Sequence, residues 1–439
     1  MSDLFSFSMF ALLFIGLASG LPLAFVLGGL ALFFGLIGWG TDCLTIFVNS
    51  VYGVMDNSSL TAVPLFVLMA NFLTASNVTE GLFDSARYLL GTLRGGVGLA
   101  VIIVATIFAA CTGVVGASVV TMGLLSIGAL TGYGYSKPLT AGLVCAGGSL
   151  GILIPPSIML VVMASTAQIS VGKLFLAALI PGLILALSYA LYTLFVCWKW
   201  PDMGPALSPE ELARVPVRDR LRGCLINLVP PMILIFSVLG SIYTGVATPT
   251  EAAAIGALFA LVLAVAYGRF SLTMLHRAVV ETAKTTTMCM AIIMCAACFT
   301  NMFLGLGGDE VVKRLIVTLG LGKWGVFILM MIILLMLGCF LDWMGIVMIV
   351  LPIFLPLMRI YAFDMIWLMT IAAVMLQTCF LTPPVGYALF YIKGVAGDLL
   401  TTQEIYKGVV PFVIIVVLMV ALLAFFPEIA TWLPSQSKA

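Results

Sequence analysis

The chain has 439 residues, of which 63% are hydrophobic and only 8% are charged, whereas about a quarter of the residues in an ordinary soluble domain are charged. Its formal net charge of +1 lacks the basic excess that nucleic-acid binding needs, so no nucleic-acid partner is expected. With a mean hydropathy of +1.25, the composition predicts an all-α polytopic membrane protein whose first partner is the lipid bilayer. At about 20 residues per helical crossing, the apolar runs provide on the order of ten to thirteen membrane segments.

Residues 1–38 form one long apolar run that is interrupted at Gly20 and Pro22. The run lacks the basic region and the small-residue cleavage site of a secretory signal, and it is too long to be one. We therefore expect a hairpin of two membrane helices that the protein retains. With no other targeting motif in the sequence, the expected location is the inner membrane of a bacterial cell, as a multi-pass protein.

Two interruptions follow in the first half of the chain, each inside an apolar run. The stretch CTGVVGAS contains Gly113, and GILIPPS, 42 residues further along, contains the tandem prolines Pro155 and Pro156. Proline removes a helical N–H bond and clashes with the preceding turn. Free backbone groups survive at membrane depth only where protein or water surrounds them. Either a simple kink or a functional helix break explains one such site.

The longest polar interval runs from Lys199 to Gly223 and carries several arginines, among them Arg220. Short loops rich in Lys and Arg remain on the cytoplasmic side of a membrane, so we place this linker in the cytoplasm. Further on, Glu251 follows Pro249 at a predicted helix start. The helix dipole stabilises a carboxylate at that place, so the expected role of Glu251 is structural.

The second half of the chain repeats the first at a nearly constant offset. Pro383 follows Pro155 by 228 residues, and Tyr361 follows Tyr133 by 228 residues. An earlier interruption around Asp342 precedes Pro383 by 41 residues, close to the spacing in the first half. An internal duplication explains this shared order of breaks. Because the breaks are paired, they favour a functional helix discontinuity over two simple kinks.

Paired broken helices near the midplane of a duplicated fold are how secondary transporters build ion and substrate sites. The carbonyls of unwound backbone hold a cation such as Na⁺, and half-helix N-termini attract anions. Each earlier interruption then becomes the tip of a re-entrant hairpin that meets the proline loop. Residues 112–118 form the first predicted tip and residues 338–342 the second.

Two polar side chains have alternative roles, and one cysteine pair raises the question of a metal site. Asp342 is either a functional acid at membrane depth or a cap of the following helix at the membrane interface. Lys393 either contacts an anionic substrate or extends to the lipid headgroups. Cys295 and Cys298 form a CxxC motif without a second pair or adjacent histidines, so no transition-metal site is expected.

Four stretches carry a resemblance to a known family: GSLGILIPPSIM, ATPTEAAAIGALFAL, LGCFLDWMGIVMIVLPIFLPL and LTPPVGYALFYIKGVAG. Over essentially the whole chain, the sequence resembles the large membrane subunit, DctM-like, of the tripartite ATP-independent periplasmic (TRAP) transporters. The resemblance implies two inverted repeats in an elevator-type transporter, with Na⁺ as the coupling ion and no other cofactor. It also implies two partners, a DctP-like periplasmic substrate-binding protein and a DctQ-like small four-helix membrane subunit, which is expected as a separate polypeptide.

The resemblance further implies two sodium sites that are built largely from backbone carbonyls. Carried onto matching positions, the first site comprises Ala109, Thr112, Gly151, Ile154 and Pro156. The repeat offset places the second site at Gly338, Leu341, Cys379, Thr382 and Pro384. The candidate substrate contacts are Gly113, Ser157, Asp342 and Lys393. Many family members read SGSS at the first tip, where this chain reads TGVV, so Thr112 supplies the tip hydroxyl here.

This architecture divides the chain into six parts. They are N-terminal scaffold helices (1–76), a first repeat with an arm helix, a re-entrant hairpin and a helix broken at 151–157 (77–198), the linker (199–223), further scaffold helices (224–304), a second repeat with a helix broken at 379–386 (305–430) and a C-terminal tail (431–439).

The expected function is sodium-coupled import of a small organic acid anion that a periplasmic binding protein delivers, by an elevator mechanism. A partner-independent secondary transporter and an intramembrane enzyme are the alternatives. An enzyme would need a nucleophile with its base, a carboxylate pair or metal ligands inside the membrane. The chain has a single histidine, His276, in a short polar patch. We therefore expect a transporter and not an enzyme.

Overall fold

The structure is a computed structural model that describes residues 2–76, 78–213, 215–308, 310–311, 314, 318 and 320–437. Over these ranges the chain is helical between its turns, and no strand occurs in them. Nine helical stretches within the described part are long and apolar enough to cross a membrane, and shorter apolar helices accompany them. The predicted class, an all-α multi-pass membrane protein, is confirmed.

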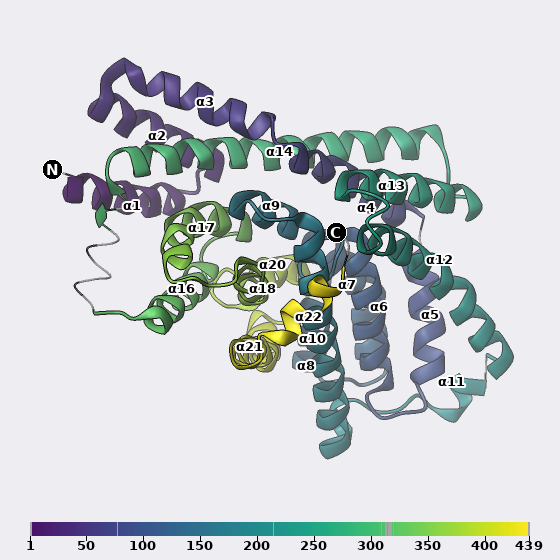
Figure 1. The fold of residues 1–439 in the computed structure, drawn as a ribbon. Coiled ribbons are helices and arrows are strands. Elements are labelled where there is room, and N and C mark those ends of the chain that lie inside the picture. The colour runs from purple at the N-terminus through teal and green to yellow at the C-terminus, as the bar shows by residue number, and fades with distance from the viewer. Residues whose placement is uncertain are drawn as a thin grey trace.

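Seven of the longer helices lie outside the two repeats. They are α1 (Ser2–Ala18), α2 (Leu23–Trp39), α3 (Cys43–Met55), α4 (Ala62–Ala75), α12 (Val217–Tyr243), α13 (Pro249–Ala266) and α14 (Leu272–Gly305), with the short η1 (Gly40–Asp42) and η2 (Ser58–Thr61) between them. The expected break at Gly20 and Pro22 separates α1 from α2. Helix α14 packs along α2, α3 and α4, and Figure 1 shows it as a long rod across the top of the molecule.

The first repeat contains each predicted element. It consists of α5 (Val78–Leu90), a hairpin of α6 (Gly96–Thr112) and α7 (Val115–Gly132), a broken helix of α8 (Lys137–Ser149), η3 (Leu150–Ile152) and α9 (Ile158–Ala167), and the closing helix α10 (Val171–Lys199). The backbone is not helical through the tandem prolines, so the predicted discontinuity is present.

The second repeat has the same order of elements. It consists of a hairpin of α16 (Lys323–Gly338) and α17 (Trp343–Ile360), a broken helix of α18 (Met365–Leu376), α19 (Thr378–Leu381) and α20 (Tyr387–Ala396), and the closing helices α21 (Thr402–Phe425) and α22 (Glu428–Gln436). Its predicted arm segment, near residues 309–319, lies largely outside the described residues.

Each closing helix runs antiparallel to the broken helix before it. In the first repeat, a β-carbon on Gly98 would lie 3.0 Å from the side chains of both Leu143 and Thr193, and one on Gly182 would lie 2.8 Å from Ile154. Residue numbers thus rise along the broken helix, from Leu143 to Ile154, while they fall along α10, from Thr193 to Gly182. The two helices are therefore antiparallel.

The second repeat has the same antiparallel arrangement at both ends of α21. Trp367 Nε1, at the start of α18, donates to the carbonyl of Leu423 at 2.8 Å. Tyr406, near the start of α21, donates to the carbonyl of Pro384 at 3.1 Å.

Across the repeats, however, α8 and α21 run in the same direction. Gly408 of α21 packs against Pro138 of α8, and Phe412, one turn later, packs against Gly142. Since α8 is parallel to α21 while α18 is antiparallel to it, the two broken helices run in opposite directions. The two repeats are therefore inverted, as predicted.

Three local features lie outside the repeat pattern. Helix α12 begins at Val217, inside the predicted linker, which also contains η4 (Pro201–Met203) and α11 (Pro209–Ala213). Helix α22 continues across the predicted boundary at residue 430. A third tandem pair, Pro230–Pro231, lies inside α12 without ending that helix.

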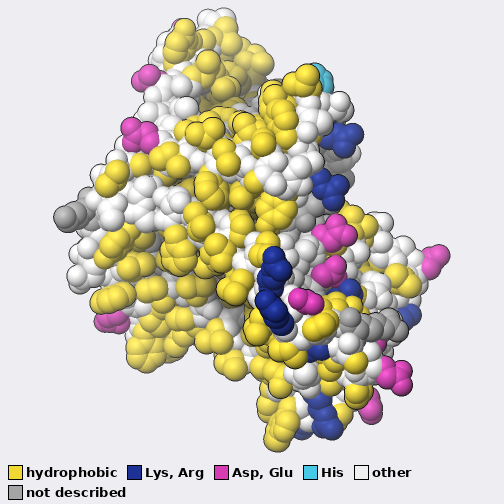
Figure 2. Space-filling model, turned by 90° about the vertical axis from the view of Figure 1, so that its right-hand side faces the viewer, with side chains coloured by type: hydrophobic (Ala, Val, Ile, Leu, Met, Phe, Trp, Pro, Cys, Tyr) yellow, Lys and Arg dark blue, Asp and Glu magenta, His cyan; other side chains and the backbone are white. Residues whose placement is uncertain are grey.

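Hydrophobic side chains cover most of the surface that Figure 2 shows, and charged side chains gather in its right and lower parts. So large an apolar surface suits contact with lipid on this face of the protein. Glu251 has the predicted structural role, because Thr248 and Glu251 form a reciprocal capping box at the start of α13.

Candidate functional site

The first hairpin tip lies directly against the first proline loop. Gly113 follows α6 as its C-cap, and its φ of 61° is left-handed and therefore suits a residue without a side chain. A β-carbon on Gly113 would lie 3.1 Å from the carbonyl oxygen of Pro156 and 3.4 Å from the Cα of Ser157. Tip and loop thus meet at backbone distance, as the sequence predicts.

A second close approach joins the same two segments. A β-carbon on Gly151 would lie 2.9 Å from the carbonyl oxygen of Ala109. Beside it, the Thr112 hydroxyl lies 2.8 Å from the Ser118 hydroxyl and 3.4 Å from the Ala109 oxygen. The structure therefore brings Ala109, Thr112, Gly151 and Pro156 together. The fifth predicted residue, Ile154, follows in the same buried loop.

The second hairpin meets its own loop at the matching place. A β-carbon on Gly338 would lie 2.9 Å from Cys379 Sγ, and the carbonyl of Cys339 accepts a hydrogen bond from Val385 N at 3.3 Å. Within this loop, the buried hydroxyl oxygen of Thr382 has no hydrogen-bond partner among the described residues. Both Pro–Pro peptide bonds, at 155–156 and 383–384, are cis.

One cavity of about 350 Å³ joins the two tips. The wall from the repeats contains Gly113, Val114, Val115, Gly116, Ile152, Ile158, Asp342, Trp343, Met344, Phe380, Tyr387 and Tyr391. The opposite wall, from α2 and α14, contains Leu23, Thr285, Met288, Cys289 and Ile292. A larger cavity of about 490 Å³ lies between α4 and α14, and its lining includes no residue of either repeat.

Four helices begin at this cavity, namely α7, α9, α17 and α20, because their first residues Val115, Ile158, Trp343 and Tyr387 line it. Each N-terminus presents N–H groups without a partner inside the helix and the positive end of a helix dipole, although Ser157 caps one N–H of α9 and Asp342 caps one of α17. No lysine or arginine is among the lining residues. The arrangement can therefore hold an anion on backbone groups alone.

Asp342 is the one charged residue in this lining. Of its two predicted roles, the structure shows the helix cap, and the role as a functional acid stays a prediction. Asp342 is the N-cap of α17 and accepts a hydrogen bond from Met344 N, a long one at 3.4 Å. It also lines the cavity, so capping the helix does not remove the carboxylate from the site.

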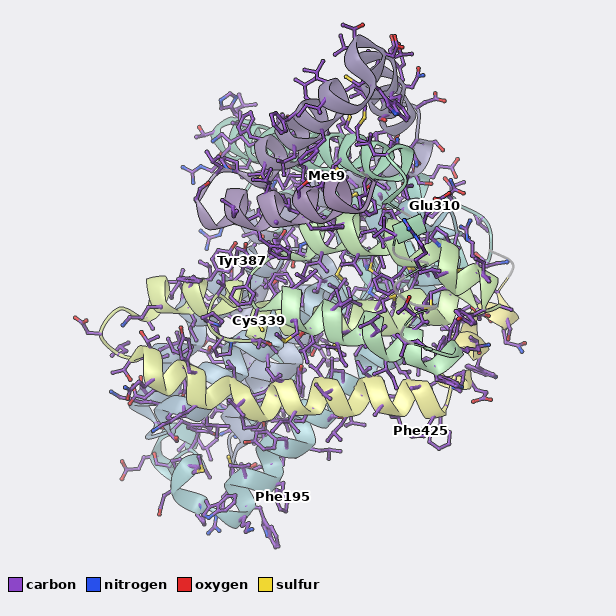
Figure 3. The ribbon with its side chains drawn as sticks, turned by 90° about the vertical axis from the view of Figure 1, so that its left-hand side faces the viewer. Met9, Phe195, Glu310, Cys339, Tyr387 and Phe425 are labelled. Carbon is purple, nitrogen blue, oxygen red and sulfur yellow. The ribbon has the colours of Figure 1, made fainter. Side chains whose placement is uncertain are left out.

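Two tyrosines on α20 complete the wall, and sequence reasoning missed both. Tyr391 lies against the first tip, since a β-carbon on Gly116 would come within 3.2 Å of its ring. Figure 3 shows Tyr387 and Cys339 in the middle of the molecule, beneath the N-terminal helices. The spacing of Tyr387 and Tyr391, one helical turn apart just after a broken loop, is the signal that could have found them.

Neither Ser157 nor Lys393, the two predicted substrate contacts outside the tips, is among the residues that line the cavity. Ser157 is buried between tip and loop and caps α9, accepting a hydrogen bond from Leu160 N at 3.5 Å. Lys393 Nζ instead donates to the carbonyls of Gly397 at 2.7 Å and Leu400 at 2.9 Å. It lines a separate small pocket between α20 and α21, and its contact with substrate stays a prediction.

Comparison with known proteins agrees with this geometry. The family model "Tripartite ATP-independent periplasmic transporter, DctM component" matches residues 8–429. The C4-dicarboxylate TRAP transporter large permease protein DctM of Pseudomonas aeruginosa is 32% identical over 397 residues, which are 90% of each chain. The isethionate TRAP transporter permease protein DctMQ of Oleidesulfovibrio alaskensis is 30% identical over 94% of this chain and 64% of that protein.

A solved structure supports the fold independently. The Alcanivorax borkumensis YdaH transporter superposes with a TM-score of 0.61 over 93% of this chain and 96% of that chain, at 14% identity. At this identity the likeness concerns the fold alone. The sequence relatives are permease subunits and not enzymes. From the family match and the 32% relative, the chain belongs to the DctM component family of the tripartite ATP-independent periplasmic transporters.

Proposed function

We propose that this chain is the permease subunit of a sodium-coupled transporter that imports a small organic acid anion across the bacterial inner membrane. The observation that carries the proposal is the cavity on which four helix N-termini converge. N–H groups and helix dipoles stabilise an anion without a cationic side chain. The names of the relatives, a C4-dicarboxylate and an isethionate transporter, support an organic anion as the class of substrate.

Sodium would bind where each tip meets its loop. Na⁺ is a hard cation that takes oxygen ligands, and unwound backbone supplies carbonyl oxygens. The first site would use Ala109, Thr112, Gly151, Ile154 and Pro156. The chemistry of the residues present suits the ion, because the chain approaches itself closely at Gly151 and the backbone of that loop is not helical over residues 153–157, which leaves carbonyl oxygens available.

The second site would use Gly338, Leu341, Cys379, Thr382 and Pro384. Its fit has an additional support, because the buried hydroxyl oxygen of Thr382 has no hydrogen-bond partner among the described residues. A buried hydroxyl without a partner costs about 1–3 kcal/mol, and a cation would provide that partner.

Coupling would follow from the shared geometry. The residues that would bind sodium adjoin Gly113 and Asp342, which line the anion cavity. An ion that orders a tip would therefore raise the affinity for the anion, and by linkage the anion would raise the affinity for sodium by the same factor. The repeats would carry both ligands past the scaffold in an elevator movement.

Two further proteins would complete the transporter. A periplasmic substrate-binding protein would deliver the anion, and a small DctQ-like membrane subunit would associate with the scaffold. The relative named DctMQ supports the second partner, since this chain covers 64% of that protein. A transporter that works without partners is the alternative.

Uptake in proteoliposomes tests the proposal. The vesicles would hold this chain with its small subunit, with the binding protein and radiolabelled C4-dicarboxylate or isethionate outside. We expect uptake under an inward Na⁺ gradient and none under an equal K⁺ gradient. Uptake without the binding protein would favour the partner-independent transporter. Uptake that ignores sodium and follows a proton gradient would overturn the sodium sites and direct attention to Asp342.

A further inference from the structure

The cavity presents two kinds of polar group that suit opposite charges. Four helix N-termini favour an anion, yet the carboxylate of Asp342 lines the same space. Two like charges about 4 Å apart repel by roughly 4 kcal/mol near a protein surface. A ligand that is only an anion would therefore have to avoid Asp342, whereas a ligand that also carries a hydrogen-bond donor could bind both groups.

The carboxylate of Asp342 is incompletely satisfied by the protein. Its hydrogen bond from Met344 N is 3.4 Å long, the backbone N–H of Trp343 is the other protein donor beside it, and no ion pair to it is found in the described part of the chain. Asp364, at the start of α18, provides the comparison, because it accepts hydrogen bonds from Ile366 N at 2.8 Å and Trp367 N at 3.0 Å. Two carboxylates in the same capping position thus differ, and the one in the cavity retains its capacity to accept.

The surroundings of Asp342 restrict which group can approach it. On the repeat side it is flanked by Trp343 and faces the α20 wall with Tyr387 and Tyr391. On the scaffold side the lining is apolar except for Thr285. A donor on the ligand therefore meets few competitors for the carboxylate other than water and the tyrosine hydroxyls.

We propose that Asp342 is a specificity-determining residue that accepts a hydrogen bond from a hydroxyl or ammonium group on the transported anion. The preferred substrates are then hydroxy acids or amino acids, and the matching acids without that group bind more weakly. This inference rests on the proposed function, because it concerns the same cavity and the same anion.

Ligand series that differ only in the donor group test the inference. The first series is succinate, L-malate and L-aspartate, and the second is ethanesulfonate, isethionate and taurine. Binding to the complex of this chain with its small subunit, in nanodiscs, is measured by tryptophan fluorescence in NaCl and in KCl. The variants are Asp342→Asn, Asp342→Glu and the control Asp364→Asn. Asparagine caps helices as well as aspartate does, so Asp342→Asn removes the charge and keeps the cap.

In the series that binds, we expect the wild type to favour the hydroxyl or ammonium member over the unsubstituted acid by about ten- to a hundredfold, the range for a hydrogen bond to a charged group. The preference should fall below about fivefold in Asp342→Asn, which keeps only a neutral acceptor. It should persist in Asp342→Glu and in Asp364→Asn. Whether malate or aspartate binds better identifies the donor.

Two results would overturn the inference. The first is equal binding of all members of a series by the wild type. The second is an undiminished preference in Asp342→Asn. If that variant also binds sodium more weakly, the carboxylate serves the ion and not the substrate. If no member of either series binds in NaCl to the wild type or to Asp364→Asn, the proposed organic-anion function itself fails, and the inference falls with it.

Discussion

The two proline loops share an architecture but differ in how completely the protein satisfies them. In the first, residues 151–157 are all buried, and the Ser149 and Ser157 hydroxyls donate to carbonyls of the same segment. In the second, Gln377 stands at the position of Ser149, and both polar atoms of its buried side chain lack a partner in the described part of the chain, as does the Thr382 hydroxyl.

The same contrast applies to the glycine at each tip-to-loop contact. The first repeat places Gly151 on the loop against Ala109 on the hairpin, and the second places Gly338 on the hairpin against Cys379 on the loop. Either choice allows the two segments to approach closely. The duplication thus preserved the close approach, while unsatisfied polar atoms directly beside a proline loop occur in the second repeat, at Gln377 and Thr382.

The largest effect is expected from Gly151→Ala. The added methyl group would lie 2.9 Å from the Ala109 carbonyl oxygen, and backbone cannot move aside as a side-chain end can. We expect a destabilisation of about 2–3 kcal/mol, within the range for overpacking, and loss of sodium-dependent uptake. Thermal unfolding of the purified complex measures the first and proteoliposome uptake the second. Wild-type stability in this variant would contradict the close approach.

A smaller effect is expected from Gly338→Ala, because its methyl group would first meet the thiol of Cys379. We expect a cost of about 1 kcal/mol. The double variant Gly338→Ala with Cys379→Gly recreates the alanine-and-glycine pair of the first repeat. It should be more stable than the sum of the single changes predicts, with a coupling of at least about 0.5 kcal/mol. Strict additivity in thermal unfolding would show that the two residues do not meet.

Thr382→Val is expected to act on ion binding and little on folding. Without sodium, removing an unpartnered buried hydroxyl should leave the unfolding temperature unchanged or raise it. We expect the sodium concentration that half-saturates binding to rise about tenfold, which is equivalent to about 1.4 kcal/mol of binding free energy. Ile154→Val, at the matching place in the first loop, is the control and should leave sodium binding near wild type. A Thr382→Val variant with normal sodium dependence would remove this hydroxyl from the second site.

The smallest effect is expected at the outer ends of the broken helices. Helix α9 is held by the scaffold, because Asn57 Nδ2 donates to Ser165 Oγ at 2.8 Å, whereas α20 is held by its own Lys393. Asn57→Ala should cost about 1 kcal/mol or less and change the uptake rate less than about fivefold. Ser165→Ala should cost less than Asn57→Ala, because Asn57 also accepts a hydrogen bond from Ser59 N at 3.1 Å, and adding Ser165→Ala to Asn57→Ala should cost nothing more. Additive losses would mean that this bond does not join scaffold and repeat.

The sequence was sufficient for the features that depend on local covalent chemistry. Tandem proline at 155–156 and 383–384 and glycine at 113 and 338 constrain the backbone directly, so hairpins, breaks and their pairing could be predicted. Pro230–Pro231 shows the limit of this rule, because α12 continues through the pair. Neighbouring helices and local adjustment can provide hydrogen-bond partners for the backbone groups that a proline frees in a membrane helix. The two prolines alone do not reveal whether such an environment is present.

Residues that depend on long-range packing were not predictable. Thr285 and Cys289 reach the cavity only because α14 packs along α17, and nothing in their own segment marks them. The surroundings of Lys393 were not predictable for a related reason. Its sequence position near the second loop suggested the anion, but its ammonium group is occupied by carbonyls at the end of its own helix.

The unequal chemistry of the two cavity walls has a consequence for the conformational equilibrium. The carboxylate, both tyrosines and the four helix N-termini belong to the repeats, and the scaffold wall is apolar except for Thr285. A ligand shifts a two-state equilibrium only by its difference in affinity for the two states. Because its polar contacts would travel with the repeats under the proposed movement, a bound anion would favour neither arrangement strongly. An anion that is bound mainly by the repeats therefore leaves both positions of the repeats relative to the scaffold accessible.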